Sequence, residues 1–342
     1  MLPCTRILSM KALTCTAFGC VEDLVLAERP SLQPGAREVV IAVEAASINH
    51  ADVLLVQGRY QIRPPLPFTP GSELAGVVKA VGAGVRRYQP GDRVIAWCGQ
   101  GGLATECATA ADRVMRLPAG MSYEQGASFL VCFGTALYGL KNRGRIRGGE
   151  TLLVLGAAGG LGLAAIQVGK KLGARVIAAA SSEDRLALCR EAGADDTVNY
   201  NDEKLNQRVL ELTAGWGADI ILDPLGGAYT EQVLRVAAPG GRLLTAGFAS
   251  GGIPCVPLNL ALLGNRSILG ISWGDFVRSN PTGHHANVRL LKRWFAEGSI
   301  HSIIDERLPL SRAVDAMARM AARQVKGKVI VLPGSAESGQ AA

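Results

Sequence analysis

From Thr151 onward, apolar runs typical of buried strands alternate with segments that have helical spacing. The first run, Thr151–Leu155, leads through a glycine-rich turn into residues 163–172, where Leu163, Ile166 and Gln167 are spaced to contact a sheet. Regular alternation of this kind predicts a parallel sheet built from strand–helix–strand units. Further strands of this sheet are expected at 175–180, 219–223, 242–247 and 267–271.

The turn after the first strand reads Gly156-Ala157-Ala158-Gly159-Gly160-Leu161-Gly162, an A-x-G-x-x-G version of the dinucleotide-binding fingerprint. Because Gly159 and Gly162 lack a Cβ, the backbone can approach a pyrophosphate closely and the helix can lie close to the strand. The free N–H groups of the first helical turn then meet the anion. The alternative is a tight turn without a ligand, but the strand and helix on either side favour the cofactor.

The end of the second strand indicates which dinucleotide binds. An NAD enzyme places Asp or Glu about 20 residues beyond the glycines, where it bonds the ribose 2′-hydroxyl. Here the strand 175–180 is followed by Ser181 and Ser182, which are expected to cap a helix that carries the next two acidic residues in its first turn. Arg185 is then a charge-assisted donor to a 2′-phosphate, or alternatively a solvated surface arginine. We predict NADPH.

Residues 10 to about 120 show a different pattern, of short strands and turns, which predicts a compact β-rich domain. Its strands are expected at 39–45, 76–82 and 93–96, with a proline-rich loop at 63–71.

The chain is long enough, at 342 residues, that two domains are expected. Ser122–Gln125 has capping-box spacing, so a helix is expected to start there, run towards Tyr138 and cross between the domains. After Gly274 the pattern leaves the sheet, with helices expected at 287–297 and 311–323 and a last strand at 327–332 that rejoins the first domain. We therefore assign residues 1–131 and 275–342 to a discontinuous β-rich domain, and residues 132–274 to the dinucleotide-binding domain.

Composition excludes several classes of function. Nearly half of the residues are apolar, but no stretch approaches a membrane span, as expected for a soluble globular protein. The net charge of +7 is spread over the chain, and its one cluster, at 141–147, is more typical of a solvated loop than of a nucleic-acid surface. The eight cysteines form no C-x-x-C pair, which predicts reduced thiols in the core and a cytoplasmic protein. Residues 1–9 are too short for a secretory signal, and Met10 is an alternative start.

Four groups of residues then occur in an order typical of one family: Asn49-His50-Ala51-Asp52 with Gly58-Arg59-Tyr60, Pro70-Gly71-Ser72-Glu73-Leu74-Ala75-Gly76-Val77-Val78, Gly91-Asp92-Arg93-Val94, and Ala157-Ala158-Gly159-Gly160-Leu161-Gly162. From Met10 to Leu332 the chain resembles the zinc-free quinone oxidoreductase branch (zeta-crystallin-like) of the medium-chain dehydrogenase/reductase superfamily. Zinc alcohol dehydrogenases of this superfamily carry Cys in place of Asn49 and His in place of Ser72. The resemblance therefore implies catalysis without a metal.

The resemblance also implies the fold and the assembly. The fold class is α/β, with a GroES-like β-rich domain, a six-stranded parallel Rossmann domain, and the active cleft between them. Family members commonly form homodimers through the last Rossmann strand, here near Ser267–Ile271. No nucleic-acid or membrane partner is expected.

For the cofactor, NADPH-dependent relatives hold the 2′-phosphate with a basic residue matching Arg185 and a tyrosine matching Tyr200, assisted by a lysine matching Lys328. From the residues alone, Tyr200 is equally an amphipathic residue at the sheet edge, and Lys328 a solvated strand lysine. The resemblance also implies that Thr135 lies beside the nicotinamide. The complete set of predicted cofactor-binding residues is Thr135, Ala158, Gly159, Gly160, Leu161, Gly162, Ser181, Ser182, Arg185, Tyr200, Gly247, Phe248, Trp273 and Lys328.

The implied chemistry is hydride transfer from the nicotinamide to an electron-poor acceptor, whose oxygen needs a polarising donor as charge builds on it. The predicted catalytic residues are Asn49, Tyr60 and Asp52, which match polar cleft positions or lie near them. Their structural alternatives are a turn former, the edge of the core and a helix cap, respectively. Some relatives carry a tyrosine at the position of Leu54, so this chain lacks that candidate for a fixed proton donor. Quinones need no dedicated acid, and this favours them as acceptors.

Three functions remain open at this point. The first is an NADPH:quinone reductase. The second is an NADPH-dependent enone or enoyl-thioester reductase, for which residues 141–147 with Arg59 and Arg63 are candidates to bind a CoA phosphate. The third is an NADPH-binding protein recruited to a non-enzymatic role, such as RNA binding, although the modest charge and the lack of aromatic residues in basic stretches argue against nucleic acid.

Overall fold

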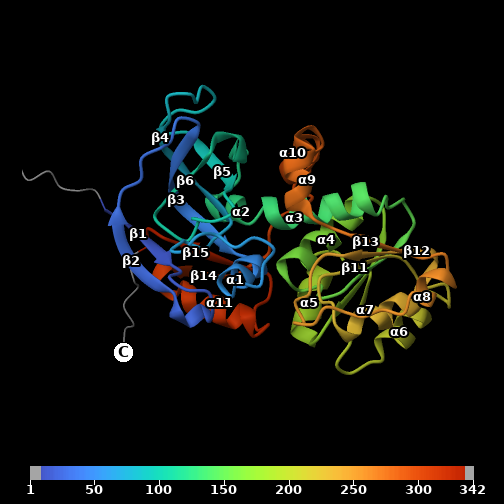
Figure 1. The fold of residues 1–342 in the computed structure, drawn as a ribbon. Helices are drawn as coiled ribbons and strands as arrows, with labels where there is room; N and C mark the ends of the chain where they lie inside the picture. The colour runs from blue at the N-terminus through green and yellow to red at the C-terminus, as the bar shows by residue number, and fades with distance from the viewer. Residues whose placement is uncertain (1–8, 336–342) are drawn as a thin grey trace, which may run out of the picture. The chain divides into compact units, whose positions relative to one another are not determined.

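The computed structural model describes residues 9–335, which divide into two compact units (Figure 1). Unit 1 comprises the residues up to Leu130 together with those from Ile304 onward, and unit 2 comprises Val131–Ile303. The expectation that Met10 is an alternative start concerns residues 1–8, which lie outside the described residues.

Unit 1 is built on a mixed β-sheet. Its strands are β1 (Ser9–Thr14), β2 (Val25–Pro30), β3 (Glu38–Ile48), β4 (Glu73–Val81), β5 (Arg93–Trp97), β6 (Glu106–Ala110), β7 (Val114–Arg116), β14 (Ile304–Pro309) and β15 (Lys328–Leu332). Its helices are η1 (Val21–Asp23), α1 (His50–Val56), η2 (Ala111–Arg113), α2 (Tyr123–Ala127), η4 (Leu310–Arg312) and α11 (Ala313–Ala321). The seven-stranded sheet has the order β14-β15-β3-β4-β5-β7, with β6 paired to β3, while β1 and β2 form a separate pair.

The long strand β3 is the centre of unit 1, because it pairs with β4, β6 and β15 at different points along its length. Its apolar side chains Val39, Ile41 and Val43 lie in the main core of the unit. Gly76 allows β4 to pack against β3, since a Cβ at this position would lie 2.0 Å from the carbonyl oxygen of Ala42. The antiparallel pairing of β15 with β3 confirms that the last strand rejoins the first domain.

Unit 2 is built on a parallel sheet. Its strands are β8 (Thr151–Val154), β9 (Arg175–Ala180), β10 (Asp196–Asn199), β11 (Ala218–Asp223), β12 (Ala237–Thr245) and β13 (Ser267–Gly270). Its helices are α3 (Leu130–Leu137, which enters from unit 1), η3 (Tyr138–Arg143), α4 (Gly160–Lys171), α5 (Glu183–Glu191), α6 (Leu205–Leu212), α7 (Ala228–Arg235), α8 (Asn259–Leu262), α9 (Trp273–Ser279) and α10 (Pro281–Ala296). The six strands have the order β10-β9-β8-β11-β12-β13 and all neighbours are parallel, which confirms the predicted Rossmann sheet.

The strand order reverses between β8 and β11. The chain first moves outward through β9 to β10 and then crosses back to β11, so right-handed connections put α4 and α5 on one face of the sheet and α6 and α7 on the other. In agreement, α4 packs beside α5, and α6 beside α7. Open α/β sheets bind ligands outside the carboxyl ends of the strands at such a reversal.

Residues 275–303, which the sequence assigned to the first domain, belong to unit 2. Phe276 stacks on Tyr138 with ring centroids 4.2 Å apart, and the side-chain amide of Gln167 forms two hydrogen bonds with the backbone of His301. The boundary predicted at 275 followed the end of the strand pattern. Contacts between helices far apart in the chain leave no such periodic signal.

Two further expectations need correction. The helix expected to run from Ser122 towards Tyr138 begins as predicted, with Ser122 Oγ accepting from the N–H of Gln125, but it breaks at Ser128 into α2, α3 and the π-helical turn η3. Of the cysteines that the structure describes, five are buried free thiols, as expected for core residues. Cys20 and Cys255 are free but exposed, because both lie outside regular strands and helices.

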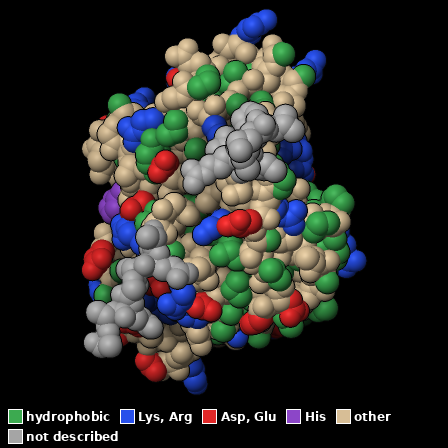
Figure 2. Space-filling model, turned by 90° about the vertical axis from the view of Figure 1, so that its left-hand side faces the viewer, with side chains coloured by type: hydrophobic (Ala, Val, Ile, Leu, Met, Phe, Trp, Pro, Cys, Tyr) green, Lys and Arg blue, Asp and Glu red, His purple; other side chains and the backbone are tan. Residues whose placement is uncertain are grey.

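Within residues 9–335, no helix is both long enough and apolar enough to cross a membrane. Over the face of the molecule in Figure 2, Lys and Arg side chains are interspersed with Asp and Glu and do not gather in one basic patch.

Candidate active site

The glycine-rich turn connects β8 to α4 at the reversal of strand order. The N–H of Ala157 donates to Ala179 O at 3.0 Å, which ties the turn to β9. A Cβ on Gly162 would lie 2.4 Å from Ala157 O, so only glycine allows α4 to start this close to the turn. A Cβ on Gly159, by contrast, would meet a single described heavy atom, Gly156 O at 3.4 Å, so this part of the turn borders open space.

This geometry fits a pyrophosphate. Gly159 is the N-cap of the twelve-residue helix α4, and the N–H groups of the first turn have no acceptor within the helix. They point out of the N-terminal end of the helix, together with its positive dipole.

The segment after β9 lacks a carboxylate at the position that selects NAD. Ser182 is the N-cap of α5, and the two acidic residues that follow lie in its first turn, as predicted. Both are engaged: Asp184 accepts from Ser182 Oγ, and Glu183 pairs with Arg190.

Arg185 and Tyr200, the predicted 2′-phosphate ligands, come from adjacent strand ends. Arg185 is half-buried in the first turn of α5, after β9. Tyr200 follows β10, and its N–H donates to Ala180 O at 3.0 Å. Asn201, which the sequence did not single out, donates from Nδ2 to Ser181 O at 2.8 Å. This hydrogen bond links the segment after β10 to the segment after β9. The structure therefore brings Ser181, Tyr200 and Asn201 together.

The ends of β11 and β12 complete the edge of the sheet. The buried carboxylate of Asp223 accepts hydrogen bonds from the N–H groups of Leu225 and Gly226 and from Thr230 Oγ1, at 2.8, 2.9 and 2.6 Å. This fixes the loop against which Gly247 packs, since a Cβ on Gly247 would lie 3.3 Å from Pro224 O. Phe248 follows and is 38% exposed. Sequence reasoning missed Asp223, although an acid that ends a buried strand before Pro-Leu-Gly-Gly is a recognisable signal.

Thr135 and Trp273 belong to one helix–helix contact. Thr135 is half-buried on α3, and the Trp273 indole lies so close to the neighbouring Gly134 that a Cβ there would meet it at 2.7 Å. His284 packs edge-on to Trp273, with ring centroids 5.6 Å apart. Burial, with a smaller effect of His285, lowers the pKa of His284 to about 4, so this imidazole is neutral at physiological pH.

The predicted catalytic residues lie in unit 1, at one end of β15, β3 and β4. Val329 pairs with Ile48, and extending this antiparallel register by one residue places Lys328 opposite Asn49. On the other side of β3, Ser47 pairs with Glu73. Since side chains alternate along a strand, the register brings Lys328, Asn49, Ser47 and Glu73 to the same face.

Lys328 lies in this cluster and is not a solvated strand lysine. It is 4% exposed, and its Nζ donates to Asn49 Oδ1 at 2.8 Å. It belongs to unit 1 with the candidate catalytic residues, whereas Arg185 and Tyr200 belong to unit 2.

Asp52 and Tyr60 show the features of their structural alternatives. Asp52, the third residue of α1, accepts from the N–H of the N-cap residue Asn49 at 2.8 Å, as a capping carboxylate does. Burial raises the pKa of Asp52 to about 6, against the opposing effects of hydrogen bonds from Asn49 and Ser72 and of the charge of Lys328. Tyr60 is partly buried against the core of unit 1.

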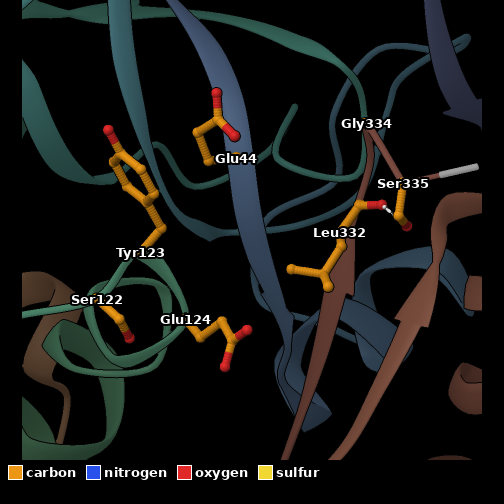
Figure 3. Close-up of a pocket in the computed structure, with 7 residues that line it drawn as sticks. All are labelled: Glu44, Ser122, Tyr123, Glu124, Leu332, Gly334 and Ser335. Atoms are coloured by element: carbon orange, nitrogen blue, oxygen red, sulfur yellow. Dashed lines mark hydrogen bonds between the residues drawn. The ribbon is translucent and has the colours of Figure 1, made fainter.

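A pocket of about 410 Å³ lies elsewhere on unit 1 (Figure 3). Its lining residues are Glu44, Ser122, Tyr123, Glu124, Leu332, Gly334 and Ser335. Two of its polar groups are already engaged: Glu124 accepts from Arg307 at 2.7 Å, and Ser335 Oγ donates to Leu332 O at 2.7 Å. None of the predicted site residues lines this pocket, and we do not assign it to the active site.

Across residues 9–335, no three His, Cys, Asp or Glu side chains gather closely enough to hold a metal ion.

A GroES-like β unit joined to a Rossmann unit defines the medium-chain dehydrogenases and reductases. In agreement, the family model for the alcohol dehydrogenase GroES-like domain matches residues 35–135, and that for zinc-binding dehydrogenase matches residues 160–286. The chain belongs to the quinone oxidoreductase-like branch of the medium-chain dehydrogenase/reductase superfamily and is an oxidoreductase of that type.

Three similar proteins illustrate this membership. The quinone oxidoreductase-like protein 2 homolog of Nematostella vectensis is 36% identical, over 94% of this chain and 89% of its own length. The structure of a mycobacterial protein complexed with NADPH has a TM-score of 0.89 and 32% identity, over 95% of this chain and 100% of that one. The enoyl reductase CurK has a TM-score of 0.85 and 27% identity, over 94% of this chain and 99% of its own.

The raised pKa of Asp52 predicts a pH-dependent contribution to stability. Because the pKa is about 6 in the folded protein and 3.8 ordinarily, this contribution is fully present below pH 4 and is lost as the pH rises through 6. The gap corresponds to about 3 kcal/mol. We expect the thermal unfolding midpoint of the wild type, relative to Asp52→Asn, to be higher at pH 4.5 than at pH 7.

The exposed Asp112→Asn is the matched control, and its difference from the wild type should stay constant over the same range. A wild-type to Asp52→Asn difference that does not change with pH would show that Asp52 is ionised throughout.

Proposed function

We propose that the protein is an NADPH-dependent, zinc-free oxidoreductase that transfers a hydride to a quinone. The observation that carries the proposal is the glycine turn at the strand-order reversal, combined with a β9 end that offers serines and Arg185 in place of an NAD-selecting carboxylate. The mycobacterial structure with bound NADPH supports the same cofactor.

The residues present fit NADPH. The turn Ala158–Gly162 and the first N–H groups of α4 would hold the pyrophosphate, while Ser181, Ser182, Arg185 and Tyr200 would hold the adenosine ribose and its 2′-phosphate. Thr135, Gly247, Phe248 and Trp273 are the candidates for the nicotinamide end. When bound, NADPH would supply the hydride. The residues named above would bind and orient the cofactor and exclude water from it.

Asn49 is the candidate donor to the acceptor oxygen, with its amide held by Lys328 and Ser47. Two features support a quinone: the relative from Nematostella vectensis is named as quinone oxidoreductase-like, and Leu54 leaves no tyrosine as a fixed proton donor. We propose that no zinc takes part, because Asn49 and Ser72 occupy positions where zinc-dependent relatives carry ligands.

Enone or enoyl-thioester reduction is the second candidate, favoured by the structural similarity to the enoyl reductase CurK. A CoA substrate would need basic groups near its phosphates, and Arg59 and Arg63 lie in the loop that follows α1. The guanidinium of Arg63 is already engaged with Gly58 O at 3.1 Å and with the Phe18 ring. This weakens its candidacy.

We further propose a homodimer that pairs through β13. This strand ends the parallel sheet, so one of its edges is open for pairing among the described residues. Apolar side chains are exposed on and near it, with Ile268 at 43%, Leu262 at 76% and Leu263 at 79%. A two-fold axis would cover this patch with its own copy. We also propose a cytoplasmic location.

Arg185→Ala tests the cofactor. Loss of a charged hydrogen bond to the 2′-phosphate should raise the Kd for NADPH by about tenfold or more, and that for NADH by less than about twofold. Fluorescence titration of both cofactors measures this. Arg235→Ala, at the exposed end of α7, removes the same charge and should change neither Kd. Equal weakening of both cofactors by Arg185→Ala contradicts the phosphate assignment.

Steady-state oxidation of NADPH and NADH against an acceptor panel tests the reaction. The panel holds an ortho-quinone, a para-quinone, a simple enone and a crotonyl thioester, each with and without a zinc chelator. We expect quinone turnover with NADPH that the chelator does not change. Turnover of the thioester alone would establish the enoyl reductase instead, and cofactor binding without any turnover would refute both.

Ile268→Asp tests the dimer, because a buried carboxylate on the pairing strand would disrupt the interface. Light scattering should give twice 35.8 kDa for the wild type and 35.8 kDa for the variant. Val25→Asp, at an exposed strand position in unit 1, should leave the wild-type mass unchanged. A monomeric wild type would refute the proposal.

A further inference from the structure

Four buried polar side chains of unit 1, those of Asn49, Ser47, Glu73 and Lys328, form a ring of contacts. Lys328 Nζ lies 2.8 Å from Asn49 Oδ1, Asn49 Nδ2 lies 3.3 Å from Ser47 Oγ, and Ser47 Oγ lies 3.1 Å from Glu73 Oε2. The ring closes with 4.0 Å between Glu73 Oε2 and Lys328 Nζ. All four residues are less than 8% exposed, so water does not replace these partners freely.

The Lys328 ammonium, which can only donate, and the Glu73 carboxylate, which accepts, fix the direction of every hydrogen bond in the ring. A lysine ammonium has donors only, so the amide atom that faces it must be the oxygen. The nitrogen of Asn49 then faces Ser47, whose hydroxyl accepts from it and donates its own proton to the Glu73 carboxylate. An isolated asparagine can exchange its oxygen and nitrogen by rotating half a turn, but the ring allows one orientation.

One amide proton of Asn49 is left over by this arrangement. Nδ2 carries two hydrogens, and the ring uses one of them for Ser47. Asn49 is buried but is the most exposed member of the ring, at 7%.

We infer that Lys328 is a positioning residue for hydride transfer: it holds the Asn49 amide so that the second Nδ2–H is the donor to the acceptor oxygen. The inference rests on the proposed function, in which Asn49 polarises that oxygen. It gives Lys328 a different task from the 2′-phosphate contact that the family resemblance implied. A donor fixed before the reaction costs no reorganisation when negative charge develops on the oxygen.

Glu73 makes the buried lysine tolerable. An unpaired ammonium at 4% exposure would be strongly disfavoured, and the opposite charge 4.0 Å away compensates it. Removing Lys328 alone leaves Glu73 without this charge, which is a risk to folding. A variant that removes both charges, Lys328→Met with Glu73→Gln, avoids that risk.

The test is a double-mutant cycle on kcat, with whichever acceptor the wild type turns over fastest. Asn49→Ala should lower kcat by about 100-fold, in the range for loss of one preorganised donor, and Lys328→Met by at least about tenfold. In the Asn49→Ala background, Lys328→Met should change kcat by less than about threefold, because the group it positions is already absent. The Kd for NADPH should stay within about twofold throughout.

Lys11→Met is the matched control, since it makes the same substitution at an exposed strand position of unit 1 and should leave kcat unchanged. The variant with Lys328→Met and Glu73→Gln should reproduce the kcat loss while keeping the wild-type thermal midpoint within a few degrees.

Losses that multiply across the cycle would show that Lys328 acts independently of Asn49 and would overturn the inference while leaving the proposed function intact. A Kd for NADPH that rises with unchanged kcat would return Lys328 to the cofactor and also overturn it. If the wild type fails to oxidise NADPH with every acceptor in the panel, the proposed function and the inference are both overturned.

Discussion

The register between β15 and β3 is the constraint on which the candidate catalytic cluster depends. Side chains alternate along a strand, so a slip of one residue would turn Lys328 to the opposite face and replace it with an apolar neighbour. The apolar side chains of β15 and β3 resist such a slip, because Val329 and Val331 would leave the core at the same time. Packing of ordinary aliphatic residues therefore places the buried charge.

In unit 2 the corresponding constraint is the space available beside the backbone. The helix α4 starts near the turn only because Gly162 has no side chain, and Gly159, also without one, leaves the open space beside the turn unfilled. In unit 2 the candidate site therefore depends on positions that lack a side chain. In unit 1 it depends on the buried charges of Lys328 and Glu73, each of which would be unfavourable without the other.

The strands, the glycine turn and the parallel sheet were predictable from the sequence. Strands such as 175–180 and the glycine turn are local patterns, and the strand–helix alternation determined the parallel sheet. The break at Ser128 and the packing of Phe276 on Tyr138 were not predictable, because they depend on contacts between distant segments. The same holds for Lys328: its position in the sequence gave a strand lysine, and only the pairing register shows that it is buried against Asn49.

The return of the chain to unit 1 has a consequence for biosynthesis. Unit 2 ends at Ile303, so a ribosome has delivered its whole sheet and its glycine turn before β14 and β15 exist. During that interval β3 lacks one of its neighbours, and Asn49 lacks the ammonium that orients it. The nascent chain therefore contains every residue of the Rossmann unit before it contains every residue of the candidate catalytic cluster. The last strand of the sheet to be synthesised is the one that makes that cluster whole.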